Sequence, residues 1–361
     1  MRRRTFLKTT SLGLASTATL AAPTIRADEP QVRWRMASSF PKSLDTIYGA
    51  GEVLAQRVND LTGGKFQIRV FAGGEIVPGL QVLDAVKANT VECGHTASYY
   101  YVGKDKAFAF DCAVPFGLTA RQQNAWMYSG GGLALTRELF AVHNIVNFPG
   151  GNTGTQMGGW FRNEVKSLAD IKGLKMRIPG LGGEIMSRLG VVAQTLPGGD
   201  IYPALERGTI DAAEWVGPYD DEKLGFHKVA KNYYYPGWWE PGPQLSFYIN
   251  ADEWKKLPAT FQKAFEVAAA EANFTMLTAY DAKNPEALVR LIKSGVKLQR
   301  YPDDILKAAQ KETFGLYEEE AAKNPAFKKI YGEWMKFRTL QHAWFSLAES
   351  SIETFMYANR K

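Results

Sequence analysis

The hydrophobic and polar positions in the first part of the chain alternate between a helical and a strand period. Five apolar residues share one predicted helical face: Ile47, Val53, Leu54, Val58 and Leu61. Gly63 and Gly64 end this helix, and residues 66–70 then alternate apolar with polar, as in a strand. Residues 32–40 predict a strand before the helix, and residues 80–88 and 90–98 predict a second helix and a further strand. This alternation predicts parallel sheets of the α/β class.

A second series of the same kind follows the glycine-rich residues 148–160. It predicts a strand over residues 175–178, a helix that ends at Gly190, and a strand–helix–strand unit over residues 191–215. The chain then runs extended over residues 238–250 and enters a long helical pattern over residues 251–295, with Asp252 as its predicted N-cap.

These two series predict a two-lobed α/β fold, with hinge crossings near residues 149–155 and 241–247. A cleft between two such lobes favours ligand binding and closes about loop hinges. We expect the first lobe to hold residues 28–151 plus 243–285. The second lobe should hold residues 152–242 plus 286–324.

The last predicted helix, residues 325–361, is apolar around an unusually wide part of its girth. Apolar residues follow a 3–4 spacing along one seam, and five more lie off that seam: Tyr331, Met335, Phe345, Ile352 and Met356. One lobe does not easily cover so wide a surface, but a second copy of the chain could. We therefore expect a homodimer built through this helix, with a helix folded over its own hinge as the alternative.

The first 27 residues predict an export signal rather than part of the fold. Arg3 and Arg4 begin a twin-arginine pattern, and the weakly apolar residues 11–22 that follow are too short to span a membrane stably. These 27 residues contain five of the 43 basic residues and no acidic one, which leaves 38 basic against 37 acidic residues, a net charge of +1. The basic balance of the whole chain is therefore no indication of nucleic-acid binding. In an exported protein, Cys93 and Cys112 could form a disulfide or remain as two buried thiols.

Candidate ligand-binding residues gather at the predicted strand ends of the second series. Arg177 ends one strand, Glu214 and Trp215 end another, and Gln156 follows the glycine-rich crossing. Arginine offers a planar fork for a carboxylate, and the oxygens of Glu214 and Gln156 suit a hard cation such as sodium, calcium or magnesium. The alternatives are an internal ion pair of Arg177 with Glu214 and a satisfied loop amide at Gln156.

Aromatic and acidic residues add to this predicted site. Glu240 lies at the second crossing beside two tryptophans, where simple hinge packing is the alternative, and Tyr100 represents three consecutive tyrosines of which one or two could reach the cleft. The sequence contains no G-x-S-x-G, H-E-x-x-H or P-loop pattern, so the motifs of the corresponding enzymes are missing.

Residues 167–180 and 204–215, behind an export signal, make the chain resemble the extracytoplasmic solute-binding subunits of tripartite ATP-independent periplasmic (TRAP) transporters. Residues 214–242 look most similar to the subgroup that binds 2-oxo acids and related 2-hydroxy acids. The resemblance implies a ligand carboxylate on Arg177 and a bridging sodium or calcium ion held by Gln156, Glu214 and the carbonyl of Trp215. It also implies that Glu240 lies near the ligand.

The resemblance further implies the two-lobed periplasmic binding protein fold. It also implies a periplasmic receptor, not an enzyme, that delivers a pyruvate-like monocarboxylate to membrane permease subunits. Two other functions remain open at this point. A receptor for lactate or a C4-dicarboxylate is the first, and a second cationic residue in the cleft would favour the dicarboxylate. An exported enzyme is the second, and turnover of a bound acid would reveal it.

Overall fold

The computed structural model describes residues 30–360, so the predicted export signal lies outside the described residues. Two mixed sheets organise the chain, with strand orders β2-β1-β3-β10-β4 and β11-β9-β5-β8-β6-β7. The first sheet contains β1 (Val32–Ser38), β2 (Phe66–Phe71), β3 (Cys93–Thr96), β4 (Ile145–Asn152) and β10 (Gln244–Asn250). The second contains β5 (Trp160–Phe161), β6 (Lys175–Arg177), β7 (Val192–Gln194), β8 (Ala212–Ala213), β9 (Asn232–Tyr235) and β11 (Lys297–Arg300). We call the parts built on these two sheets the first lobe and the second lobe; the exact lobe boundaries given above stay a prediction.

The expected parallel pairing is present in part of each sheet. β1 pairs in parallel with β2, and β6 pairs in parallel with both β7 and β8. The α/β class is confirmed, but the sheets are mixed rather than parallel throughout, because β10 runs antiparallel to β3 and β4, and β5 runs antiparallel to β8 and β9. β4 and β5 flank the first crossing, and β10 follows the second, so the chain leaves the first sheet on one strand and re-enters it on the strand beside it in the opposite direction.

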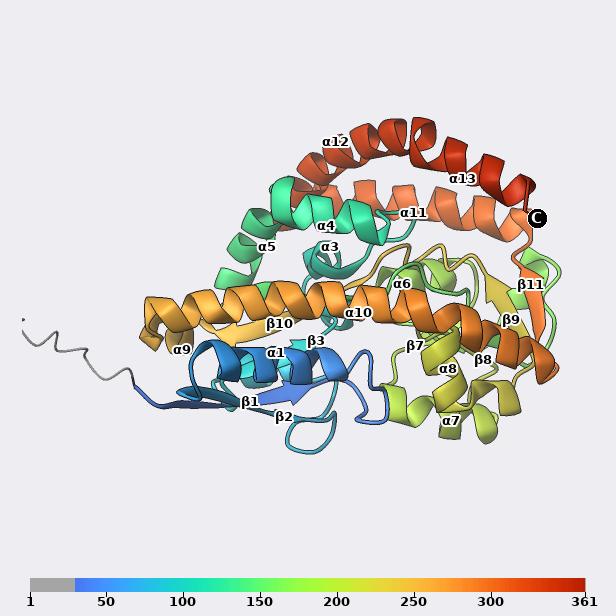
Figure 1. Cartoon of the computed structure of the whole chain (residues 1–361). Helices are drawn as coiled ribbons and strands as arrows, with labels where there is room; N and C mark the ends of the chain where they lie inside the picture. Colours follow the sequence, from blue (N-terminus) through green and yellow to red (C-terminus); the bar gives the residue numbers. More distant parts are fainter. Residues whose placement is uncertain (1–29, 361) are drawn as a thin grey trace, which may run out of the picture. The chain divides into compact units, whose positions relative to one another are not determined.

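Helices surround both sheets (Figure 1). The α-helices of the first part are α1 (Gly49–Leu61), α2 (Val82–Lys87), α3 (Ala109–Cys112), α4 (Ala120–Ser129) and α5 (Gly132–Ala141). Those of the second part are α6 (Gly180–Arg188), α7 (Gly198–Glu206) and α8 (Pro218–Leu224). The rest are α9 (Ala251–Lys256), α10 (Ala259–Lys293), α11 (Asp303–Lys323), α12 (Pro325–Leu347) and α13 (Glu349–Ala358). Short 3-10 helices lie at Ser98–Tyr101, Lys106–Phe108, Leu168–Ile171 and Phe226–Lys228. None of the described helices is both long and apolar enough to cross a membrane.

The long helical pattern after residue 250 forms two helices rather than one. Asn250, not Asp252, is the N-cap of α9, because its side chain accepts hydrogen bonds from the backbone amides of Asp252 and Glu253. α10 then continues for 35 residues and passes through Pro285. It contacts α1 and β4 in the first lobe and α8 in the second, so one helix lies along both lobes (Figure 1).

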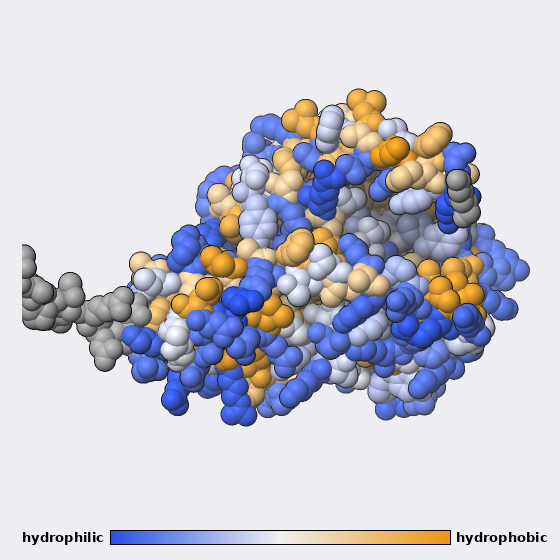
Figure 2. All heavy atoms as spheres, viewed as in Figure 1, coloured by the Kyte–Doolittle hydropathy of each residue, from blue (hydrophilic) through white to orange (hydrophobic). Residues whose placement is uncertain are grey.

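The C-terminal segment also differs from a single helix, because it breaks at Ala348 between α12 and α13. The first turns of α12 bury Phe327, Ile330 and Trp334 within the molecule's own core. Further along, apolar side chains are exposed, including Leu340, Trp344, Leu347, Phe355 and Tyr357. Figure 2 shows apolar atoms gathered over this part of the molecule, along α12 and α13. Cys93 and Cys112 are buried free thiols, so the structure has the second of the two alternatives and not a disulfide.

Candidate functional site

Arg177 and Glu214 meet because their strands are neighbours. β6 ends at Arg177, Glu214 follows β8 directly, and the two strands pair in parallel with Arg177 opposite Ala213. The carboxyl ends of parallel strands lie at one edge of a sheet, where ligands commonly bind. Both side chains are almost fully buried, at 1% and 0% exposure. The predicted convergence of these two residues is therefore present in the structure.

The guanidinium of Arg177 is only partly satisfied by the protein. Its Nη1 atom contacts the Oε1 atom of Glu214 and donates to the backbone carbonyl of Glu214 at 2.8 Å, while Nε donates to the carbonyl of Leu196 at 3.1 Å. The internal ion pair considered from the sequence thus exists. The Nη2 atom is buried without a hydrogen-bond partner among the described residues. A ligand carboxylate would therefore meet Nη2 rather than an open fork of two nitrogens.

Glu214 likewise retains one uncommitted oxygen. Its Oε2 atom is buried and has no partner in the described part of the chain. Burial raises the pKa of Glu214 to about 7, the guanidinium of Arg177 opposes this shift, and the charge of Asp221 adds to it. A buried carboxylate oxygen of this kind costs free energy unless a donor or a cation satisfies it.

Backbone hydrogen bonds join Gln156, which follows the first crossing, to the segment just before the second crossing. Its amide donates to the carbonyl of Glu240 at 3.1 Å, and its carbonyl accepts from Gly237 at 3.2 Å. The side-chain Nε2 atom donates to the hydroxyl of Thr153 at 3.2 Å, which leaves Oε1 buried with no partner from residues 30–360. Gln156 is therefore not the fully satisfied loop amide of the alternative, because its side-chain oxygen lacks a partner in the described part of the chain.

The ring of Trp215 lies beside Arg177 and is held in place by Asp220. The centre of the guanidinium lies 5.1 Å from the centroid of its ring, within the range of a cation–π contact. Its indole nitrogen donates to the Oδ2 atom of Asp220 at 3.3 Å, and the hydroxyl of Tyr280 donates to the same oxygen at 2.7 Å. Asp220 therefore links the orientation of Trp215 to helices α8 and α10.

Glu240 and the three consecutive tyrosines occupy different positions around this centre. The hydroxyl of Tyr99 donates to the Oε2 atom of Glu240 at 3.3 Å. Burial raises the pKa of Glu240 well above its usual value, and the nearby Glu214 adds to that shift. Burial also raises the pKa of Tyr100, against the opposing effect of Arg177. Tyr101 instead bonds Thr96 and the amide of Leu83 in the first lobe, so Tyr99 and Tyr100 are the two that reach the site.

A small cavity of about 10 Å³ lies beside these residues, and it is lined from both lobes. Its walls include Phe40, Ile47, Tyr99, Tyr100, Gln156 and Trp215. A much larger open groove of about 870 Å³ runs along β1, β2 and α1, but it shares no residue with this cavity. Because the groove has none of the partnerless buried atoms described above, we place the candidate site at the small cavity.

The side chains at this site fit a carboxylate together with a cation. Arg177 presents one donor nitrogen, while Glu214 and Gln156 each present one acceptor oxygen, and all three atoms are buried without partners among residues 30–360. Oxygen atoms are the preferred ligands of sodium and calcium. The described residues contain no group of three histidine, cysteine, aspartate or glutamate side chains that could hold a metal ion.

Several residues that support the site were not identified from the sequence. Asp220 and Asp221 are buried and bond Trp215 and Trp160 respectively, and the indole of Trp239 lies near enough to Glu214 to lower its pKa. Two acids that follow Gly217-Pro218-Tyr219 are typical of ordinary charges in the first turn of a helix. The only signal for their role was that both precede a stretch rich in tyrosine and tryptophan.

Two α/β lobes with a small cavity lined from both of them are the architecture of a two-lobed solute-binding protein. The profile of the bacterial extracellular solute-binding proteins, family 7, matches residues 37–324, and the chain belongs to this family. A monocarboxylate 2-oxoacid-binding periplasmic protein of Nostoc is 57% identical over 360 residues, which cover 98% of this chain and 99% of the relative.

Solved structures of TRAP transporter solute-binding proteins share the fold. One from Bordetella bronchiseptica, a mixed-occupancy dimer with copurified calcium and picolinate, is 53% identical with a TM-score of 0.90, over 91% of this chain and 98% of that one. One from Pseudoalteromonas atlantica, with bound sodium and pyruvate, is 38% identical with a TM-score of 0.87, over 90% and 99%. One from Colwellia psychrerythraea, with bound calcium and pyruvate, is 37% identical with the same TM-score and coverage.

Proposed function

We propose that this protein is a periplasmic receptor that binds a small 2-oxo monocarboxylate together with a sodium or calcium ion and delivers the acid to TRAP permease subunits. The observation that carries the proposal is that three buried atoms, Arg177 Nη2, Glu214 Oε2 and Gln156 Oε1, have no partner among residues 30–360. Arg177 contacts Glu214 and the ring of Trp215, and Gln156 and Trp215 both line the cavity. One donor and two acceptors match an anion and a cation bound side by side. The relatives with bound pyruvate and either ion support the same pairing.

The chemistry of a 2-oxo acid explains why the cation and the ligand would bind together. Its carboxylate and its neighbouring carbonyl oxygen can chelate one ion, which supplies the oxygens that the protein lacks. Glu214, Gln156 and the backbone carbonyl of Trp215 would complete the coordination, and Arg177 Nη2 would hold the second carboxylate oxygen. Glu240 and Tyr100 would face the ligand from the side of the crossings. The cation also neutralises the repulsion between Glu214 and the ligand.

A monocarboxylate fits better than a C4-dicarboxylate. The residues that line the cavity include no lysine or arginine, and Arg177 lies beside the lining residue Trp215, whereas two carboxylates call for two cationic partners. The cavity itself admits roughly one water-sized sphere. Even a three-carbon acid therefore requires side chains to move, and a longer acid requires more.

Calorimetry on protein freed of bound ligand by unfolding and refolding tests this function. Pyruvate should bind in calcium and in sodium, and succinate should bind at least about tenfold more weakly, because its second carboxylate would lack a partner. Absence of pyruvate binding in both ions would contradict the proposal. Nuclear magnetic resonance of pyruvate left with the protein should show an unchanged spectrum, and product formation would favour the enzyme alternative.

Export and assembly complete the proposal. The Arg3-Arg4 pair supports the twin-arginine route, and replacing both by lysine should leave the precursor in the cytoplasm. The exposed apolar residues of α12 and α13 support a homodimer through the C-terminal segment. The family consists of solute-binding receptors, and we propose that this member has no catalytic activity.

A further inference from the structure

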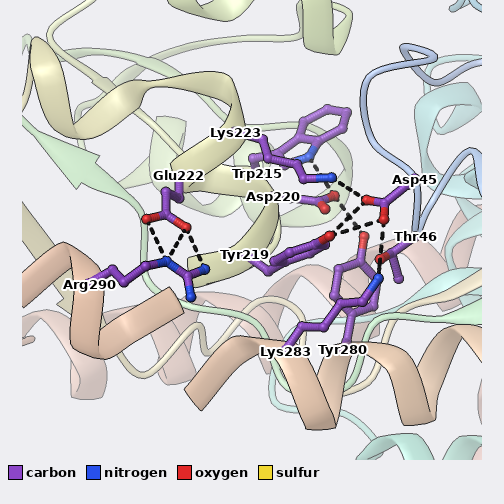
Figure 3. A network of polar contacts seen from close by, with 10 residues as sticks. All are labelled: Asp45, Thr46, Trp215, Tyr219, Asp220, Glu222, Lys223, Tyr280, Lys283 and Arg290. Atoms are coloured by element: carbon purple, nitrogen blue, oxygen red, sulfur yellow. Dashed lines mark hydrogen bonds and ion pairs between the residues drawn. The ribbon is translucent and has the colours of Figure 1, made fainter. Parts of the chain in front are cut away.

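A second polar cluster joins the two lobes outside the binding site (Figure 3). Asp45 lies in the loop between β1 and α1, which is anchored in the first lobe by the buried Leu44 and Ile47. Its partners come from α8 and from the end of α10 that contacts α8. The cluster therefore connects one lobe to the other rather than bracing a single lobe.

The carboxylate of Asp45 meets three partners at once. The hydroxyl of Tyr219 lies 3.1 and 3.0 Å from its two oxygens, Lys283 Nζ lies 3.2 Å from Oδ2, and Lys223 Nζ contacts Oδ1. Lys283 also reaches the hydroxyl of Thr46 at 3.4 Å. We call Asp45, Tyr219, Lys223 and Lys283 the Asp45 cluster.

Asp45 carries the negative charge that faces two positively charged lysines. Lys223 Nζ and Lys283 Nζ lie 4.5 and 4.7 Å from the ring centroid of Tyr219, so both ammonium groups crowd one aromatic ring. The charge of Asp45 compensates both. Burial raises the pKa of Asp45, but the hydrogen bonds from Lys223, Lys283 and Tyr219 outweigh it and lower that pKa to about 2. The carboxylate is therefore charged at every ordinary assay pH.

The elements that carry the Asp45 cluster also build the binding cavity. On the first-lobe side, the same loop supplies Phe40 and Ile47 to the cavity wall. On the second-lobe side, α8 begins directly after Trp215 and Val216, and its Asp220 holds the indole of Trp215. The amide of Tyr219 is bonded at 3.0 Å to the side chain of Asn284 in α10, which fixes the start of α8. Separation of Asp45 from α8 would thus open the cavity between Ile47 and Trp215.

From this arrangement we propose that Asp45 is a positioning residue that retains the ligand by holding the lobes together over it. The proposal rests on the proposed function for the identity of the ligand, but its geometry does not involve the residues that would contact the ligand. Asp45 acts through Lys223, Lys283 and Tyr219. Its loss should therefore accelerate ligand release and leave the encounter of ligand with the open protein nearly unchanged.

The partial exposure of these side chains sets the size of the effect. The side chain of Asp45 is 51% exposed, and those of Lys223 and Lys283 are 31% and 39% exposed, so solvent screens their attraction. An exposed ion pair contributes little alone, but one carboxylate shared by two ammonium groups forms a small network. We expect Asp45→Asn to raise the dissociation rate of pyruvate by about three- to tenfold at low ionic strength.

Stopped-flow tryptophan fluorescence in calcium buffer tests this expectation on the whole mature protein. Glu271→Gln is the matched control, because Glu271 makes a long-range ion pair of 2.5 Å with Arg57 that joins α1 to α10 within the first lobe. Pyruvate release should accelerate in Asp45→Asn but not in Glu271→Gln. Rising potassium chloride should accelerate release from the wild type until it approaches the variant. Release rates within about 1.5-fold of each other at low salt would overturn the proposal.

A double-mutant cycle separates a network from general loss of structure. Lys223→Met with Lys283→Met should accelerate release, and adding Asp45→Asn to this pair should change the rate little further, because the interaction is already lost. Fully additive effects of Asp45→Asn and the lysine pair would show that they act independently and would overturn the network.

A ligand-free measurement distinguishes failure of this proposal from failure of the proposed function. Spin labels on cysteines introduced at Lys87 and Arg207, which are exposed in the first and second lobes, report the distance between lobes, because Cys93 and Cys112 are buried. Asp45→Asn should shift the distance distribution toward a more open state, and Glu271→Gln should not. If pyruvate fails to bind the wild type, the proposed ligand is wrong, and this distribution still decides the role of Asp45. An unchanged distribution would overturn it.

Discussion

Gly198 lies against the ring of Trp215, with no space between them for a side chain. A Cβ atom at residue 198 would come 2.6 Å from the Cη2 atom of Trp215 and about 3 Å from two further ring atoms. The first residue of α7 therefore helps to fix the tryptophan that stacks near Arg177. The neighbouring Gly199 has nothing within 4 Å of such a Cβ atom.

This contrast gives a matched pair of variants. Gly198→Ala should push the Trp215 ring out of place, lower stability by about 1–3 kcal/mol through overpacking, and weaken pyruvate binding severalfold. Gly199→Ala should bind pyruvate as the wild type does. Calorimetry and thermal unfolding measure both effects. Normal affinity in a Gly198→Ala protein would remove the ring of Trp215 from the site.

The uncommitted Nη2 atom of Arg177 leads to a second prediction. Arg177→Ala should weaken pyruvate binding by about 30-fold or more, because a buried charged hydrogen bond is lost and Glu214 is left without its partner. Arg188→Ala serves as the control, since Arg188 lies at the end of α6 and pairs with the exposed Glu319. Less than a threefold change in Kd for Arg177→Ala would contradict the assignment.

The cation should be required for tight binding of the acid. Removal of both sodium and divalent ions should weaken pyruvate binding by an order of magnitude or more, because Glu214 and the ligand would then repel each other without compensation. Glu214→Gln should weaken the dependence on the cation as well as the affinity. Calorimetry in choline chloride with a chelator, against calcium and sodium buffers, makes the measurement. Equal affinity in all three buffers would exclude the bridging ion.

The exposed apolar residues of the C-terminal helices predict the oligomeric state. The mature protein should sediment as a dimer, and Leu347→Glu with Phe355→Glu should produce monomers, because both apolar side chains would then be replaced by charges within the contact. Val142→Glu is the control, since Val142 is equally exposed but lies after α5. Wild-type monomers at micromolar concentration would exclude the dimer. Truncation before residue 330 is a poorer test, because it removes the buried Trp334.

Asp111 gives a prediction about pH. It is buried and accepts hydrogen bonds from Ser246 at 2.7 Å and Asn147 at 2.8 Å, and from Ser98. Burial raises its pKa to about 6, against these hydrogen bonds. Because the folded-state pKa lies above the ordinary value, the folded protein binds this proton more tightly. The charged form therefore costs stability above pH 6, and that cost is relieved as the pH falls from about 6 toward 4.

Asparagine at residue 111 cannot carry the charge and so lacks this dependence. Relative to the wild type, Asp111→Asn should be more stable at pH 7.5 than at pH 4.5. The difference in unfolding free energy between the two proteins should change by about 2 kcal/mol between these pH values. Denaturant unfolding at both pH values measures it, with the exposed Asp60→Asn as control. A difference that is the same at both pH values would show that Asp111 does not titrate in this range.

The sequence predicts the site best where strand order determines position. Arg177 and Glu214 each follow an apolar strand, and two parallel neighbours necessarily bring such residues to one edge. The same reasoning could not select among the tyrosines, because Tyr99, Tyr100 and Tyr101 form a 3-10 helix whose side chains point in different directions. It also could not foresee the antiparallel strands, since pairing depends on where the crossings re-enter the sheet rather than on hydrophobic period.

Contacts between charged residues that lie far apart in the sequence are still harder to predict. Asp45 lies 178 residues from Lys223 and 238 from Lys283, and each reads alone as an ordinary surface charge. The break at Ala348 is similarly unpredictable from the sequence, because alanine favours a continuous helix.

The helix α10 gives the molecule an elastic element. It is held in the first lobe by its packing against α1 and β4, and in the second by Asn284, which accepts a hydrogen bond from the start of α8. Parting the lobes therefore bends one rod instead of turning a free joint. Pro285 lacks an amide hydrogen, so the rod is softest beside its attachment to α8. Opening would then store bending energy in the backbone, so the stiffness of a single helix would add to the surface charges in opposing separation of the lobes.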